Sequence, residues 1–355
     1  MEPKKILLRS SGVLGWKTHN NKIKRDLMHQ NVNITETPYE PKLHHKLLIK
    51  PYGRSFSNFR IPLVSPAKMS NFLSKGSKDS VEYDVIYAAS HIGLGGYEHM
   101  KARKIVTCDA CIPSVIDSFG AKYFNENDIS YEKHLLSLAD KIFCMSHWTY
   151  KGLEKHYPEV INSCEILPSY IPDPVIGNIS EKKNAKIELG YKEQDFIVAY
   201  ISNSYKRKGG GIVKDLISKH NAVEWMVFGS SSKNFGNNHN LLKMPYIENS
   251  VLLNKYLKAA DCLVLPSFVD MAPHVLGEAV SAGCALVTTN VGGLPEVCIN
   301  NYNGYTVNDL QSMSEKIKFL SEDRSLLENF QNMSLLMATE ANLKQEEVIT
   351  REILS

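Results

Sequence analysis

The sequence predicts an α/β protein with two domains. Its 355 residues are enough for two domains of ordinary size. Hydrophobic residues make up 43% and charged residues 22% of the chain, values typical of a globular protein. Short apolar runs alternate with segments of helical spacing, and this alternation is the pattern of a parallel sheet with helices between its strands.

In the first half of the chain, apolar runs too short for helices predict buried strands. Prolines near the middle of the sequence, Pro172 and Pro174, indicate a linker between domains. We therefore expect a first domain at residues 1–172. Its predicted strands lie at residues 5–9, 84–90, 104–110, 141–146 and 164–168, and its predicted helices at 17–30 and 134–140.

The second half repeats the pattern and predicts a second domain at residues 173–340. One of its helices is expected to start at Pro273, because proline suits the first helical position, and to end at Gly283. The predicted strands lie at residues 196–202, 223–230, 262–265 and 285–288, with a short strand after the turn at 302–305. The other predicted helices lie at 249–260, 310–321 and 325–340.

Two carboxylates flank the helix start after the strand at 262–265. Asp270 precedes the helix and Glu278 lies inside it. The N–H groups of His274, Val275 and Leu276 are expected to lack intrahelical partners, which would make them an anion site at the positive end of the helix dipole. A phosphate there would place a linked sugar or ribose near a carboxylate, which binds hydroxyls well.

A basic, glycine-bearing turn follows the strand at 196–202. Arg207 and Lys208 come just before Gly209, Gly210 and Gly211. Glycine lets the backbone approach a phosphate, and the basic side chains supply the opposite charge. The turn predicts a second contribution to phosphate binding.

Loops after strands of the first half supply weaker candidates. Gly12 lies in a turn where an α/β domain exposes backbone to ligand. His91 follows the strand at 84–90 and is a candidate acceptor contact or general acid/base group. Seven scattered cysteines indicate reduced core residues in a cytosolic protein.

Positive charge is concentrated in one segment. Residues 1–172 hold 23 Lys/Arg and 17 Asp/Glu, and residues 41–78 hold eight Lys/Arg with no acid. That segment is interpreted either as a solvated insertion or as a basic, aromatic-bearing surface. A surface of this kind suits a lipid phosphate at a membrane face, a phosphorylated glycan or nucleic acid.

The spacing from Asp270 to Glu278 resembles the Glu-x7-Glu signature of retaining glycosyltransferases of family 4, with Asp in place of the first Glu. The resemblance implies the GT-B fold, in which two Rossmann-like doubly wound domains face a central cleft. It also implies that the tail at 341–355 packs back on the first domain. Lys208-Gly209 matches the family's Lys-Gly, whereas Asn203 stands where the family has Arg.

The resemblance further implies residue roles. Glu278 would hold ribose hydroxyls, and Asp270 would bind hydroxyls of the donor sugar. The family commonly has a His-Asp pair near the donor sugar; this chain has Cys108 at the His position and Asp109 at the Asp position. Without an adjoining basic partner, Cys108 is interpreted as a packing residue. The candidates are therefore, as catalytic residues, Asp270, Asp109 and His91, and as donor-binding residues Lys208, Asn203, Arg207, His274, Val275, Leu276, Glu278 and Gly12.

The implied activity is a retaining transfer of a sugar from a nucleotide-sugar, UDP- or GDP-linked, to a hydroxyl of a glycan or lipid-linked acceptor. No Asp-x-Asp triplet occurs, so neither a metal nor another cofactor is expected. The expected location is the cytoplasm, with contact to the inner membrane face through residues 41–78; nucleic acid is not the expected partner. Three alternatives stay open: a GT-B phosphorylase or a nucleotide-sugar hydrolase or epimerase, a catalytically degenerate nucleotide-sugar-binding scaffold, and a protein that binds nucleic acid or an anionic surface through 41–78.

Overall fold

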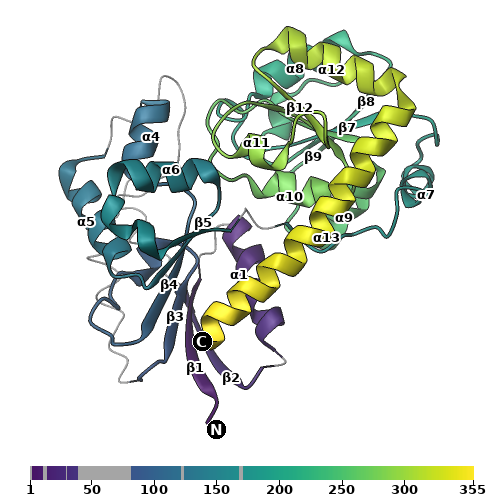
Figure 1. Ribbon diagram of the computed structural model, residues 1–355. Helices are drawn as coiled ribbons and strands as arrows, with labels where there is room; N and C mark the ends of the chain where they lie inside the picture. The colour runs from purple at the N-terminus through teal and green to yellow at the C-terminus, as the bar shows by residue number, and fades with distance from the viewer. Residues whose placement is uncertain (1, 11–13, 29, 39–80, 121–123, 168–170) are drawn as a thin grey trace. The chain divides into compact units, whose positions relative to one another are not determined.

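The computed structural model describes residues 2–10, 14–28, 30–38, 81–120, 124–167 and 171–355. The chain divides into two compact units, one of residues 1–168 with 344–355 and one of residues 169–343. Each unit contains a six-stranded sheet in which every neighbouring pair of strands is parallel (Figure 1). The predicted α/β class with two doubly wound sheets is confirmed.

The first unit has the strand order β2-β1-β3-β4-β5-β6. Its strands are β1 (Lys4–Ser10), β2 (Val32–Pro38), β3 (Val85–Ala88), β4 (Arg103–Cys108), β5 (Lys141–Cys144) and β6 (Cys164–Ile166). Its helices are α1 (Leu14–Leu27), α4 (Ile112–Phe119), α5 (Glu126–Ser137) and α6 (His147–His156), with short 3-10 turns η1 (His91–Leu94) and η2 (Pro158–Ser163).

Both faces of this sheet are buried, and alternate residues of each strand serve opposite faces. In β1, Leu7 packs on the side covered by α5 and α6, while Ile6 and Leu8 pack on the side of α1 and the end of the chain. Figure 1 shows α4, α5 and α6 on one side of the sheet and α1 with the last turns of α13 (Arg324–Leu354) on the other. This double burial explains why the strands appear in sequence as continuous apolar runs.

The second unit has the strand order β12-β11-β10-β7-β8-β9, so that β7 lies beside β10 where the order reverses. Its strands are β7 (Ile197–Ile201), β8 (Glu224–Phe228), β9 (Leu241–Met244), β10 (Cys262–Leu265), β11 (Ala285–Thr289) and β12 (Gly304–Val307). Its helices are α7 (Glu181–Glu188), α8 (Gly210–Lys219), α9 (Ser250–Ala259), α10 (His274–Ser281), α11 (Leu294–Val297) and α12 (Leu310–Glu322), with the 3-10 turn η3 (Ser232–Asn234).

The predicted strands are confirmed to within one or two residues, but β2 and β9 were missed. Both are edge strands with a single neighbour. An edge strand is less buried, so it lacks the continuous apolar run that marks the others.

Several predicted helix bounds were wrong. The helix expected at 134–140 is α5, Glu126–Ser137, which starts early because Asn125 and Asp128 form a capping box. Helix α1 starts and ends three residues before the prediction. Helix α10 begins at His274, and Pro273 is its N-cap residue instead of its first helical residue.

The last helix is much longer than predicted. Helix α13 runs from Arg324 to Leu354, whereas the apolar spacing indicated an end near residue 340. Its final turns belong to the first unit, where Val348, Ile349 and Ile353 join the core. Lys4 Nζ also donates to the carbonyl of Leu354 at 2.8 Å. Among the described residues, no helix combines the length and apolar character that a bilayer crossing requires.

A buried ion pair fixes the amino end of β10. Lys186 on α7 lies 2.8 Å from the carboxylate of Asp261, which also accepts the N–H of Ile197 at 2.9 Å. Gln331 of α13 donates to the same residue. One carboxylate thus connects β7, β10 and two helices.

Replacing Lys186 by methionine is expected to destabilise the protein by about 3–5 kcal/mol, because it leaves the buried Asp261 carboxylate without its cation. Chemical denaturation measures this change. Lys183→Met on the same helix is the matched control, since Lys183 is paired with Glu193 at an exposed position; equal losses in the two variants would contradict the assigned role.

Candidate active site

Two loops of the second unit lie at the carboxyl ends of β7 and β10. These strands are neighbours at the point where the strand order reverses, the usual ligand position in an open α/β sheet. The loops are joined by backbone as well as side-chain contacts. Phe268 N–H donates to the Arg207 carbonyl at 2.9 Å, and the Arg207 guanidinium donates to the Val269 carbonyl at 2.8 Å.

An ion cluster lies between the two loops. Lys208 Nζ contacts Asp270 Oδ2 at 2.9 Å, and Arg207 Nη1 lies 3.6 Å from Asp270 Oδ1. The Ser267 hydroxyl donates to Oδ2 at 3.1 Å. Burial favours a raised pKa for Asp270, but the charges of Lys208 and Arg207 outweigh it and lower the pKa. The carboxylate is therefore ionised at neutral pH.

Two glycines allow backbone segments of the site to pack closely against each other. A Cβ on Gly209 would lie 2.0 Å from the Pro266 carbonyl oxygen, and one on Gly292 would lie 1.8 Å from that of Asp270. Both residues have positive φ, +70° and +55°. Gly293 N–H then donates to the Met271 carbonyl at 2.9 Å. In this structure, these glycines serve the packing of the loop that carries Asp270.

Glu278 and His274 on α10 lie in the same electrostatic environment. Burial raises the pKa of Glu278 to about 7, although Lys208 lowers it. Burial and then Lys208 lower the pKa of His274 to about 4, so that its imidazole is neutral at pH 7. Burial and Arg207 also lower the pKa of Lys208, while Asp270 acts in the opposite direction. The cluster thus contains two cations, the carboxylate of Asp270, which is ionised at neutral pH, and the carboxyl of Glu278, which titrates near pH 7.

Some predicted donor-binding groups already have structural partners. The Leu276 N–H, expected to be without a partner, donates to the Pro273 carbonyl at 3.1 Å, and the Leu276 side chain lies in the core. The Val275 side chain is also buried there. Asn203 accepts the N–H of Ser230 at 2.8 Å and so connects the ends of β7 and β8. The expectation of three free amides at this helix start is wrong for Leu276.

His91 and Asp109 lie in the first unit after the neighbouring strands β3 and β4. Burial raises the pKa of Asp109, while the charge that His91 carries when protonated lowers it, so the two side chains influence each other. His91 Nε2 is 3.2 Å from Oε1 of Glu132, a residue that sequence reasoning missed. Gly12 and residues 41–78 lie outside the described residues.

Cys108 is fully buried, and its thiol donates to the Ala110 carbonyl at 3.2 Å. With Cys111 it forms a Cys-x-x-Cys spacing that the sequence reasoning overlooked. Burial raises the pKa of Cys111 to about 12 and that of Cys108 well above its ordinary value. Neither thiol is activated as a nucleophile, and all seven cysteines are free.

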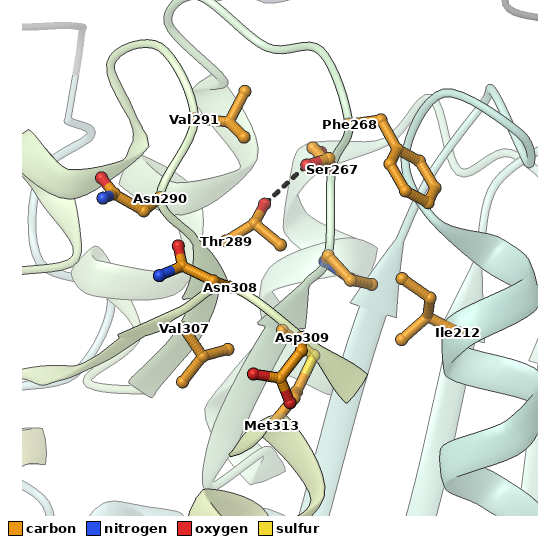
Figure 2. Close-up of a pocket in the computed structure, with 11 residues that line it drawn as sticks. Ile212, Ser267, Phe268, Thr289, Asn290, Val291, Val307, Asn308, Asp309 and Met313 are labelled. Carbon is orange, nitrogen blue, oxygen red and sulfur yellow. Dashed lines mark hydrogen bonds between the residues drawn. The ribbon is translucent and has the colours of Figure 1, made fainter. Parts of the chain in front are cut away.

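A pocket of about 160 Å³ lies beside the loop of Ser267 (Figure 2). Its apolar lining includes Ile212, Val307 and Met313, and Asn290 and Asn308 contribute polar groups. Figure 2 shows the Thr289 hydroxyl donating to the Ser267 carbonyl, a bond of 2.6 Å. None of the predicted site residues lines this pocket.

Residues 181–334 match the family model described as "Glycosyl transferases group 1". This stretch is similar to group 1 glycosyltransferase domains. It contains Arg207, Lys208, Asp270, His274 and Glu278, so the ion cluster lies inside the matched stretch. In the part of the chain that the structure describes, no cluster of three or more His, Cys, Asp or Glu is arranged to hold a metal ion.

Sequence relatives include named glycosyltransferases. An uncharacterized glycosyltransferase of Methanocaldococcus jannaschii is 26% identical over 140 residues, 36% of this chain and 35% of the relative. The phosphatidylinositol N-acetylglucosaminyltransferase GPI3 subunit of Saccharomyces cerevisiae is 26% identical over 204 residues, 51% of this chain and 43% of the relative. The matches thus span less than half the length of these relatives.

Solved structures share the whole fold. Sucrose-phosphate synthase of Thermosynechococcus elongatus has a TM-score of 0.74 at 14% identity, covering 99% of both chains. Anabaena HepE in complex with UDP-glucose has a TM-score of 0.69 at 14% identity, covering 99% of both chains. The fold is GT-B, as expected. The family match and the sequence relatives show that this chain is similar to glycosyltransferases.

The raised pKa of Glu278 makes folding stability depend on pH. Between about pH 4.5 and pH 7 the folded protein retains a proton that the unfolded chain has released, so stability falls as pH rises through this window. Glu278→Gln removes this dependence. From pH 4.5 to pH 8 the stability of the variant relative to wild type is expected to rise by roughly 2–3 kcal/mol. Denaturant unfolding of both proteins across this pH range provides the measurement. If the stability of the variant and that of the wild type change with pH in the same way, Glu278 is not a buried carboxyl that titrates near pH 7.

Proposed function

We propose that this protein is a retaining glycosyltransferase that moves a sugar from a UDP- or GDP-sugar to an acceptor hydroxyl without a metal ion. The observation that carries the proposal is the cluster of Arg207, Lys208, Asp270 and Glu278, which lies at the carboxyl ends of β7 and β10 and inside the stretch that matches the group 1 glycosyltransferase model. Both the fold position and the chemistry suit a nucleoside diphosphate.

The cations of the cluster suit the diphosphate. Lys208 has three ammonium protons, of which Asp270 engages one, and Arg207 Nε is buried without a hydrogen-bond partner among the described residues. Both side chains therefore retain donors. A bound diphosphate would also favour the charged form of Lys208, which burial now disfavours. Preorganised donors of this kind stabilise the charge that develops on a leaving diphosphate.

The two carboxyl groups suit hydroxyls. Glu278 would bind the ribose of the nucleotide, since its pKa near 7 lets it accept hydrogen bonds as a carboxylate or donate one as an acid. In Asp270, Oδ2 is engaged by Lys208 and Ser267, whereas within the described part of the chain Oδ1 has only the longer contact to Arg207. We assign Oδ1 to a hydroxyl of the donor sugar and Oδ2 to the orientation of Lys208.

The names of similar proteins support the choice of substrates. Anabaena HepE has structures with UDP and with UDP-glucose, and the yeast relative is a phosphatidylinositol N-acetylglucosaminyltransferase subunit. By extension, we propose a glycan or lipid-linked acceptor and peripheral contact with the cytoplasmic membrane face. Retention follows from the family resemblance, in which the acceptor attacks from the face that the diphosphate leaves.

Glu278→Ala is expected to weaken nucleotide-sugar binding by roughly 10–100-fold, because the hydrogen bonds between Glu278 and the ribose hydroxyls together contribute about 1.5–3 kcal/mol. A thermal-shift panel of UDP- and GDP-sugars identifies the donor, and calorimetry then gives the affinities. Glu315→Ala on the exposed face of α12 is the control. An unchanged donor affinity in Glu278→Ala would refute the role of Glu278.

Product analysis tests the reaction itself. With the identified donor and a panel of hydroxyl acceptors, NMR of the product is expected to show the anomeric configuration of the donor, at a rate unaffected by EDTA. Inverted configuration excludes the retaining mechanism, and loss of the rate in EDTA excludes metal independence. Donor binding without transfer to any acceptor would favour a nucleotide-sugar-binding scaffold.

A further inference from the structure

Glu132 is a buried carboxylate to which the sequence assigns no role. It lies on α5, and only 2% of the residue is exposed. Its Oε2 accepts the N–H of Ile112 at 2.7 Å and the hydroxyl of Tyr157 at 2.8 Å. Its Oε1 lies 3.2 Å from His91 Nε2. Two neutral donors thus occupy one oxygen and leave the other oxygen to the histidine.

His91 has two ring nitrogens in a buried position. The residue is 4% exposed, and neither nitrogen makes a hydrogen bond among the described residues, although Nε2 lies 3.2 Å from Glu132 Oε1. A buried polar atom without a partner is unfavourable by about 1–3 kcal/mol, so such an atom marks a place where a further group binds. His91 follows β3 and Asp109 follows β4, at the carboxyl ends of paired strands where ligands bind.

The contact with Glu132 favours one tautomer of His91. Glu132 Oε1 is an acceptor 3.2 Å from Nε2, so a proton on Nε2 is favoured and Nδ1 of the neutral ring keeps its lone pair. We propose that Glu132 is a positioning residue that holds His91 in this tautomer, so that Nδ1 accepts a hydrogen bond from a hydroxyl of the carbohydrate substrate. This inference rests on the proposed function and extends it to a site in the first unit.

The contacts of Oε2 make Glu132→Gln an informative variant. Ile112 N–H and Tyr157 O–H both point at Oε2, so the glutamine must place its carbonyl oxygen there. Its NH₂ group then faces His91 Nε2, and a donor at that position favours the opposite tautomer, with the proton on Nδ1. The capping of the first amide of α4 is retained, because the glutamine oxygen still accepts the N–H of Ile112.

Nitrogen NMR of ¹⁵N-histidine-labelled protein reads the tautomer directly, and His91→Gln identifies the His91 signals. The wild type is expected to show Nε2–H for His91, with a shift of Nδ1 on addition of the acceptor that the transfer assay identifies. Glu132→Gln is expected to show Nδ1–H and a loss of at least about tenfold in kcat/KM for the acceptor, with donor affinity unchanged. Glu126→Gln, on the exposed side of the same helix, is expected to behave as wild type.

The outcomes separate this inference from the proposed function. A wild-type His91 with its proton on Nδ1 overturns the inference without the need for any variant. A tautomer change in Glu132→Gln that leaves kcat/KM equal to that of Glu126→Gln also overturns it, because His91 then does not contact the substrate. A wild-type protein that transfers no sugar refutes the proposed function, and with it the substrate role of His91, whereas the tautomer remains measurable.

Discussion

The contact between Lys208 and Asp270 is the interaction on which the candidate site of the second unit depends. It joins the loop after β7 to the loop after β10. The neighbouring hydrogen bond from Arg207 to Val269 joins the same two loops and spans 62 residues of the chain. The backbone of Gly209 lies close to the Pro266 carbonyl, and the backbone of Gly292 lies close to the Asp270 carbonyl. Because neither glycine has a Cβ, the loops can approach closely enough for this contact. Lys208 also affects the charges of its neighbours, because it lowers the pKa of Asp270, His274 and Glu278.

This arrangement gives the site a defined response to an anion. Burial alone disfavours the charge on Lys208 and on Glu278, and it keeps His274 neutral. An incoming diphosphate would strengthen the charge on Lys208 and favour the protonated form of Glu278. We therefore expect nucleotide binding in this site to be accompanied by proton uptake near neutral pH, with Asp270 ionised throughout.

The sequence was sufficient for the fold because buried parallel strands appear as apolar runs, and it failed where that physical signal is weak. The edge strands β2 and β9 lack it, and the early start of α5 depends on the side chains of Asn125 and Asp128. The spacing of Asp270 and Glu278 predicted a polar site, but not that Lys208 pairs with Asp270, because that contact depends on strand order. Glu132 gave no signal, since a glutamate among charged residues on a helix ordinarily faces solvent.

The two units stabilise buried carboxylates in different ways, and the difference matters for what each can bind. Asp270 is held by two cations, which retain donors for an anionic ligand. Glu132 is held by an amide, a phenol and an imidazole, none of which carries a fixed positive charge. A neutral hydroxyl is a ligand that fits an imidazole nitrogen. The direct contacts of the two carboxylates thus favour the nucleotide diphosphate in the second unit and a sugar hydroxyl in the first.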